Sequence, residues 1–219
     1  MNTVITDKDL KMLDGRHRAT LLNSLAGFRT AIIVGTLSGN DVPNAAIFNS
    51  LIHFGADPAL WGLVMRPDPL NRDTFRNILL RKRYTLNYLP SEYAQNAHKT
   101  SAKYTTEESE FHACGLTPQL NMDDGAPFVA EAKIKILMEL VETIPVSLNE
   151  TTIVIGRPIQ IDYPTTMVST DGFVNLAEGN ILGCIGLDAY CTANAVVRFE
   201  YAKPGVEVVE KDLGHGAGA

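Results

Sequence analysis

Two short β-rich segments joined by a tight turn place the strongest constraint on this chain. Residues 30–37 are rich in β-branched side chains, and a similar run follows at 42–48, after Ser38-Gly39-Asn40-Asp41. Glycine and asparagine tolerate the positive φ angles that a hairpin turn needs. The pattern therefore predicts an antiparallel hairpin near the start of the chain.

The remaining segments extend this into a mainly β fold with helical inserts. Strand-like runs are found at residues 60–65, 84–89, 132–143 and 151–162. Spacing and capping residues predict helices at 10–25 with Gly27 as its C-cap, from Asp73 as an N-cap, at 93–98, and at 107–114 ended by Gly115. Because strands and helices do not alternate regularly, an antiparallel barrel is favoured over a parallel sheet.

No repeat or linker divides the chain, so we expect one domain over residues 1–219, with a barrel core at about 20–195 and a disordered tail at 214–219. A net charge of −6 argues against nucleic acid and anionic membrane surfaces as partners. No segment has the roughly 20 apolar residues of a membrane span. Residues 1–18 lack a signal-peptide core, which indicates a cytoplasmic protein.

Isolated cysteines and histidines give little indication of chemistry. The odd cysteine count and wide spacing argue against a disulfide framework or a paired-cysteine zinc site, so we expect free thiols. His53, His98 and His112 fall in different predicted elements, which argues against a metal site. His98 lies in a polar, basic segment and is kept as a candidate contact to a cofactor or substrate. Glu107, Glu108 and Glu110 are interpreted as a solvated helix face.

One segment does suggest chemistry. Residues 66–77 contain a strand end, a proline-stiffened loop and a helix start. Free backbone N–H groups and the positive end of the helix dipole make such a start a natural anion site, and Arg72 and Thr74 add further donors. The alternative from these residues alone is a capped surface helix with solvated arginines.

An ordered set of motifs carries a family resemblance. The set consists of Asn44–Asn49, Asp57-Pro58, the strand 60–66, the helix start 72–78, Tyr84–Leu89, Glu110-Phe111 through Gly115-Leu116, Ile181-Leu182-Gly183 and Tyr190. In this order and spacing it resembles the flavin reductase-like, FMN-binding split-barrel family, which includes flavoredoxin and the reductase components of two-component monooxygenases. The resemblance covers roughly residues 20–195.

The resemblance implies a dimer that binds FMN without a catalytic side chain or a metal. The strand 44–49 would lie beside the isoalloxazine with its backbone amides facing the ring, and Arg66, Arg72, Thr74 and Asn77 would hold the phosphate or ribityl chain. The expected cofactor-binding residues are Asn44, Ala45, Ala46, Ile47, Phe48, Asn49, Ser50, Arg66, Arg72, Asp73, Thr74, Asn77 and His98. The chain departs from the family pattern at Asn49, where many members have Ser or Thr, and at Ala59, where the usual residue is Pro.

The implied activity is hydride transfer from NADH or NADPH to FMN, with electrons passed to oxygen, to a partner monooxygenase or to another acceptor. Backbone amides near residues 46–48 would stabilise negative charge on the reduced ring. No Gly-x-Gly-x-x-Gly sequence follows a strand, so a Rossmann nicotinamide site is not supported. Two alternatives stay open: an FMN-binding electron carrier without NAD(P)H activity, and a split barrel that has lost flavin and binds another phosphate-bearing ligand.

Overall fold

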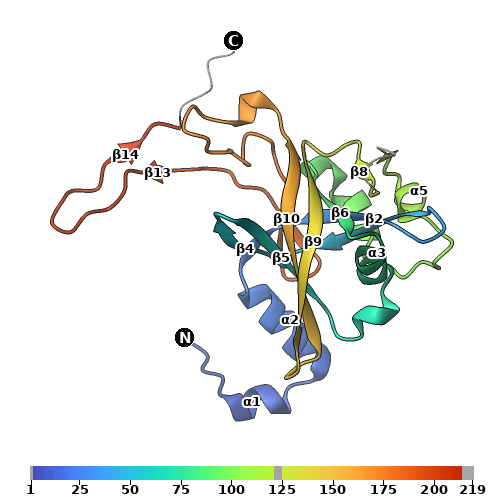
Figure 1. The fold of residues 1–219 in the computed structure, drawn as a ribbon. Helices are drawn as coiled ribbons and strands as arrows, with labels where there is room; N and C mark the ends of the chain where they lie inside the picture. Colours follow the sequence, from blue (N-terminus) through green and yellow to red (C-terminus); the bar gives the residue numbers. More distant parts are fainter. Residues whose placement is uncertain (1, 121–124, 214–219) are drawn as a thin grey trace.

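The structure is a computed structural model that describes residues 2–120 and 125–213, so the predicted tail at 214–219 lies outside the described residues. Its centre is a seven-stranded antiparallel sheet in the order β3-β2-β6-β9-β10-β5-β4 (Figure 1). The elements are α1 (Asp7–Met12), α2 (Gly15–Leu25), β1 (Phe28–Thr30), β2 (Ile32–Leu37), β3 (Pro43–Phe48), β4 (Leu51–Ala56), β5 (Ala59–Met65), α3 (Asp73–Arg81), β6 (Arg83–Tyr88), α4 (Ala94–Lys99), α5 (Glu110–Cys114), β7 (Pro118–Gln119), β8 (Phe128–Val129), β9 (Ile134–Val146), β10 (Thr151–Asp162), β11 (Gly183–Ile185), β12 (Ala189–Cys191), β13 (Arg198–Phe199) and β14 (Glu210–Lys211). The predicted fold class, mainly antiparallel β with helical inserts, is confirmed.

Strand β2 is covered on both faces because successive side chains of a strand point in opposite directions. Ile32 and Val34 belong to one apolar cluster, which also contains Phe75 and Ile78 of α3. Ile33 faces a second cluster, which includes residues of α4 and α5. The β2–β3 hairpin is therefore fixed between two cores.

The predicted hairpin is present, with β2 and β3 in a register that places Thr36 opposite Asn44. Strand β4, in contrast, was not predicted. It pairs with β5 with a register shift between His53 and Gly55. Its sequence, Leu51-Ile52-His53-Phe54-Gly55-Ala56, does not alternate between apolar and polar residues. In the structure its middle residues His53 and Phe54 are exposed.

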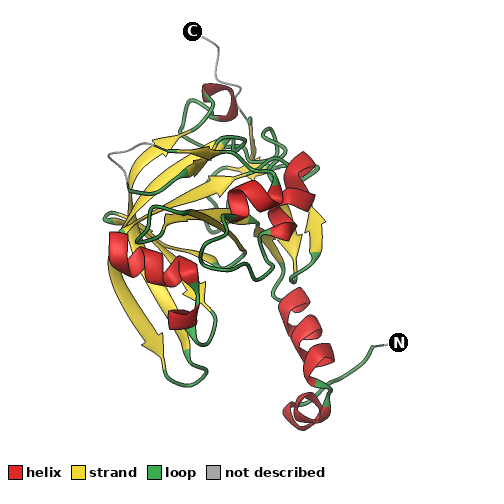
Figure 2. Ribbon diagram, turned by 90° about the vertical axis from the view of Figure 1, so that its right-hand side faces the viewer, coloured by secondary structure: helices red, strands yellow, loops and turns green. Residues whose placement is uncertain are grey.

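The single helix predicted at residues 10–25 is wrong. Helix α1 ends at Met12 with an extended C-cap at Leu13, and Asp14 then caps α2 by accepting hydrogen bonds from the backbone N–H groups of Arg16 and His17. Neither helix has a buried residue, and both project from the body of the protein (Figure 2). Within residues 2–120 and 125–213, no helix has the length and apolarity that crossing a membrane requires.

The C-terminal part forms an arm that extends away from the barrel (Figure 1). Strands β13 and β14 pair within this arm. Asp171 forms ion pairs with Arg198 and Lys211, both at 2.7 Å. These two cations on opposite strands hold the arm to the loop that contains Asp171.

Candidate functional site

Strand β3 lies at the edge of the sheet, with only β2 as a neighbour. The backbone N–H of Ala45 points away from β2, since it donates to Glu110 Oε2 at 3.2 Å. In an antiparallel pair such outward residues alternate with inward ones, so Ile47 also presents its N–H and C=O to the open edge. The amides of Ala46 and Phe48 face β2 instead. Among the β3 residues Asn44 to Phe48, Ile47 is therefore the one whose backbone N–H is at the open edge and has no protein acceptor among the described residues.

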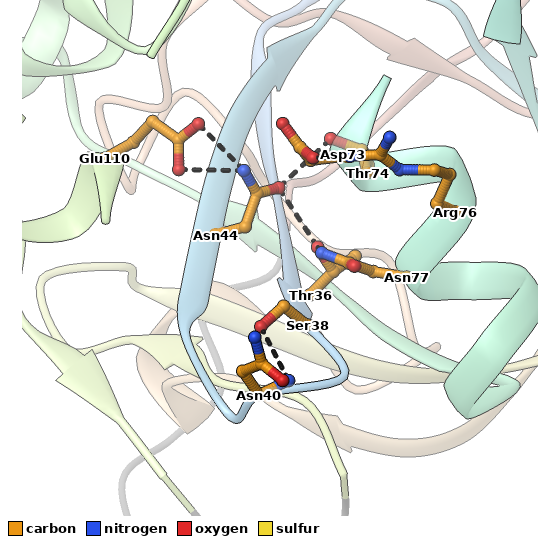
Figure 3. Close-up of polar contacts among 9 residues, drawn as sticks. All are labelled: Thr36, Ser38, Asn40, Asn44, Asp73, Thr74, Arg76, Asn77 and Glu110. Carbon is orange, nitrogen blue, oxygen red and sulfur yellow. Dashed lines mark hydrogen bonds and ion pairs between the residues drawn. The ribbon is translucent and has the colours of Figure 1, made fainter. Parts of the chain in front are cut away.

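A buried polar cluster joins β3 to the start of α3 (Figure 3). Asn44 Oδ1 accepts hydrogen bonds from Thr36 Oγ1 at 3.0 Å and from Thr74 Oγ1 at 3.2 Å. Asn77 Nδ2 donates to Thr36 Oγ1 at 3.1 Å. None of the four side chains is more than 8% exposed. Because the proton of Thr74 is directed inward, an anion at this helix start would meet the backbone N–H groups rather than the threonine hydroxyl.

Glu110 completes this cluster from the other side of β3 (Figure 3). Both of its carboxylate oxygens accept from Asn44 Nδ2 at 2.8 Å. Its interpretation as a solvated residue is wrong, because only 8% of it is exposed and it forms no ion pair within the described part of the chain. Burial raises the pKa of the Glu110 carboxyl above its usual range.

The start of α3 provides unpaired donors. Asp73 is the first helical residue rather than the predicted N-cap, and its carboxylate pairs with Arg76. The actual N-cap is Arg72, whose side chain makes no capping hydrogen bond. The exposed Arg66 and Arg72 take part in no salt bridge among the described residues. Free N–H groups, the helix dipole and two unpaired cations make this a candidate anion-binding site.

Comparison with protein-family models identifies a flavin reductase like domain over residues 27–176. The chain belongs to this family. The match covers β1 through β10 and includes every residue of the predicted site. Membership of this flavin reductase-like family makes the chain a flavin-binding oxidoreductase in its general class.

Solved structures of the flavin reductase-like fold agree. A protein from Shewanella frigidimarina assigned as a flavin reductase with a split barrel domain is 38% identical, with a TM-score of 0.87 over 92% of this chain and 100% of that one. Nitrilotriacetate monooxygenase component B from Bacillus cereus has a TM-score of 0.77 at 21% identity, covering 92% of this chain and 99% of its own. Flavoredoxin of Desulfovibrio vulgaris has a TM-score of 0.67 at 20% identity, covering 81% and 91%. The last two likenesses show the shared fold.

Asn49 and Ser50 follow the end of β3 and stabilise the fold of this flavin reductase-like chain. Asn49 Nδ2 donates to the backbone oxygen of Gly186 at 2.7 Å. Ser50 Oγ donates to the Val64 oxygen at 3.1 Å and accepts from the Val64 N–H at 3.2 Å. Neither side chain is hydrogen-bonded to the cluster around Asn44, and Ser50 has no hydroxyl proton left for a phosphate.

His98 lies in α4 and contacts Tyr190 of β12, with His98 Nδ1 and the tyrosine oxygen 2.9 Å apart and the rings edge to face. Burial raises the pKa of Tyr190 to about 12. Ile47 and Tyr190 both pack against the second apolar cluster. His98 therefore lies on the side of β3 that faces away from α3.

Sequence reasoning did not identify Thr36 and Glu110 as site residues. A signal for Thr36 existed, because the turn at residues 38–41 sets a hairpin register that pairs it with Asn44. Glu110 has no comparable signal. Its burial depends on Ser109, whose hydroxyl donates to the Pro43 oxygen at 2.6 Å and so holds α5 against β3.

Proposed function

We propose that this chain binds FMN, with the phosphate at the start of α3 and the isoalloxazine along the open edge of β3. The observation that supports this most directly is the start of α3, which has no side-chain cap and has the unpaired Arg72 at its N-cap, with the unpaired Arg66 in the loop that leads to it. A phosphate bearing two negative charges matches such a set of donors. The backbone of Ile47 offers one donor and one acceptor to a ring with alternating carbonyl and nitrogen atoms.

The proposed activity is hydride transfer from NADH or NADPH to the flavin, followed by electron transfer to oxygen, a partner monooxygenase or another acceptor. When bound, FMN supplies the hydride and electron chemistry. The chain's own groups bind and orient the flavin: Arg66, Arg72 and the first N–H groups of α3 at the phosphate, and the Ile47 N–H where negative charge develops on the ring. The names of the Bacillus monooxygenase component and of flavoredoxin are consistent with either a reductase or an electron carrier.

Visible spectra test this proposal directly. The purified protein is titrated with FMN and, separately, with FAD, and then treated anaerobically with NADH or NADPH. Bound FMN that bleaches with one nicotinamide supports the reductase, and bound FMN that stays oxidised selects the electron-carrier alternative. Preference for FAD would correct the cofactor, and absence of flavin binding would contradict the proposed function.

The phosphate assignment predicts the effect of Arg72→Ala. Removing one charge-assisted contact weakens FMN binding by about 1.5–3 kcal/mol, a factor of roughly 10 to 150 in Kd. Fluorescence titration measures it, with riboflavin as the ligand that lacks the phosphate. Arg157→Ala is the matched control, since Arg157 is an exposed arginine on β10 paired with Glu139. Equal Kd values for the Arg72→Ala variant and the unmodified protein would rule out the role of Arg72.

We further propose that two copies of this chain form a dimer. Two features support it: α1 and α2 have no buried residues, and the arm exposes Phe199 and Tyr201, at 58% and 89%. Exposed apolar residues gathered on projecting segments are typical of surfaces that are covered on association.

A further inference from the structure

We propose that Glu110 is a positioning residue of the phosphate site, and that its negative charge makes FMN bind more weakly as the pH rises. This inference rests on the proposed location of the FMN phosphate at the start of α3. Helix α5 has no predicted contact with the flavin. Through Glu110, it would nevertheless control how tightly the phosphate site binds FMN.

The connection between Glu110 and α3 is a single side-chain amide. Asn44 Nδ2 donates to both carboxylate oxygens of Glu110 at 2.8 Å, and Asn44 Oδ1 accepts from Thr74 Oγ1 at 3.2 Å. The carboxylate thereby fixes which end of the amide faces the helix. With Oδ1 turned toward α3, Thr74 donates inward and the first turn of the helix is held in place.

The charge of Glu110 has no positively charged partner among the described residues. Its hydrogen-bond donors are the neutral Asn44 amide, the Ala45 N–H and its own backbone N–H, which favour the ionised form, while burial opposes it. The titratable neighbours are Asp73 at the start of α3, which raises the pKa of Glu110 further, Tyr104 in the preceding loop and Cys114 on α5 itself. Lys99 of α4 acts on Cys114, and β3 contributes no titratable side chain. Tyr104, with its pKa raised to about 12, stays neutral in the pH range of interest.

Two consequences follow from placing a phosphate near this buried carboxylate. An ionised Glu110 repels the phosphate, and a protonated one does not, so affinity falls as the pH rises through the pKa of Glu110. By linkage, bound FMN must raise the proton affinity of Glu110 by the same factor. At a separation of roughly 10 Å and an effective dielectric constant of about 20, that factor is about tenfold for each negative charge on the phosphate.

The test compares the protein with its Glu110→Gln variant, which keeps the shape of the side chain and removes the charge. Kd values for FMN and riboflavin are measured from about pH 5 to pH 8. We expect the ratio of unmodified to variant Kd for FMN to rise by a factor of at least about ten as the pH passes through the pKa of Glu110, and the ratio for riboflavin to stay constant. The second ionisation of the FMN phosphate, with a pKa of about 6, increases the repulsion by Glu110 in the unmodified protein alone and therefore adds to the rise of the ratio.

Glu108→Gln is the matched control, since Glu108 is exposed in the segment just before α5. An FMN ratio that stays constant with pH while both proteins bind FMN would overturn the role of Glu110 and leave the proposed function standing. Absence of FMN binding by the unmodified protein would overturn both. If Glu110→Gln does not fold, carboxyl ¹³C NMR of the unmodified protein gives the answer: FMN must raise the proton affinity of Glu110 about tenfold and riboflavin must not.

Discussion

Asn87 shows how much a single side chain contributes to this fold. It is fully buried in β6, where its Nδ2 donates to the Ile33 oxygen at 3.0 Å and to Thr85 Oγ1 at 2.8 Å. Its Oδ1 accepts from the Val129 N–H at 2.9 Å. One amide thus joins β2, β6 and β8, and it satisfies a backbone donor of a strand only two residues long.

Replacing this residue by Asn87→Ala should destabilise the protein by about 2–4 kcal/mol, because the Val129 N–H loses its acceptor and a cavity is left. Urea unfolding followed by circular dichroism measures the change. Asn23→Ala serves as the control: Asn23 is half-buried on α2 and donates to the Ala19 oxygen of the same helix in an exposed hydrogen bond, and the expected change there is within about 0.5 kcal/mol. A loss below 1 kcal/mol for Asn87→Ala would contradict the prediction.

The sequence identified three of the five residues of the polar cluster. Thr74 was found from its place at the helix start, and Asn44 and Asn77 from the family resemblance. Glu110 was missed because one charged residue among several looks solvated until the tertiary structure buries it. Asp73 was predicted as the N-cap of α3 but is its first helical residue. Aspartate is favoured at both positions, and the sequence does not distinguish them.

At the scale of elements, strands with a clear turn or alternation were predictable, and those without were not. The β2–β3 hairpin follows from its turn residues. Strand β4 was missed because its sequence does not alternate between apolar and polar residues. The first helix was predicted without its break because the apolar spacing of residues 10–25 continues across Asp14. Local capping by Asp14 prevailed over that periodicity.

Close packing between β2, β6 and the loop before β8 gives an element-scale prediction. A Cβ at Gly35 would overlap the Pro127 carbonyl oxygen and the Thr85 hydroxyl. We expect Gly35→Ala to cost about 1–3 kcal/mol, because a backbone atom cannot move aside as a flexible side chain can. Thermal unfolding by calorimetry measures it. Gly15→Ala, where nothing lies within 4 Å of the added methyl, should be neutral or slightly stabilising, and equal effects at both positions would refute the argument.

At the scale of the whole molecule, the barrel is accompanied by two projecting parts, the helices α1 and α2 and the C-terminal arm (Figures 1 and 2). The sequence placed the barrel core at about 20–195, which leaves the arm outside it. Nothing in local pattern indicates where such segments lie, because their position depends on contacts beyond their own residues. A two-stranded ribbon of this kind has little stability of its own in water.

The proposed dimer predicts a mass of twice 23.9 kDa in sedimentation equilibrium. Charges introduced on the arm by Phe199→Glu together with Tyr201→Glu should shift the equilibrium toward monomer, because burying an unpaired carboxylate opposes association. Leu148→Glu, a change at a residue 95% exposed in the β9–β10 turn, serves as the control. A dimer of unchanged affinity in the double variant would remove the arm from the interface, and a monomeric unmodified protein would contradict the dimer itself.

The open edge of β3 has a consequence for the empty protein. At Ile47 the edge keeps an unpaired N–H and C=O, and such groups can pair with a strand of another molecule. If flavin occupies that edge, the cofactor also shields the protein from unwanted strand pairing. The concentration of free flavin would then govern the solubility of this chain as well as its activity.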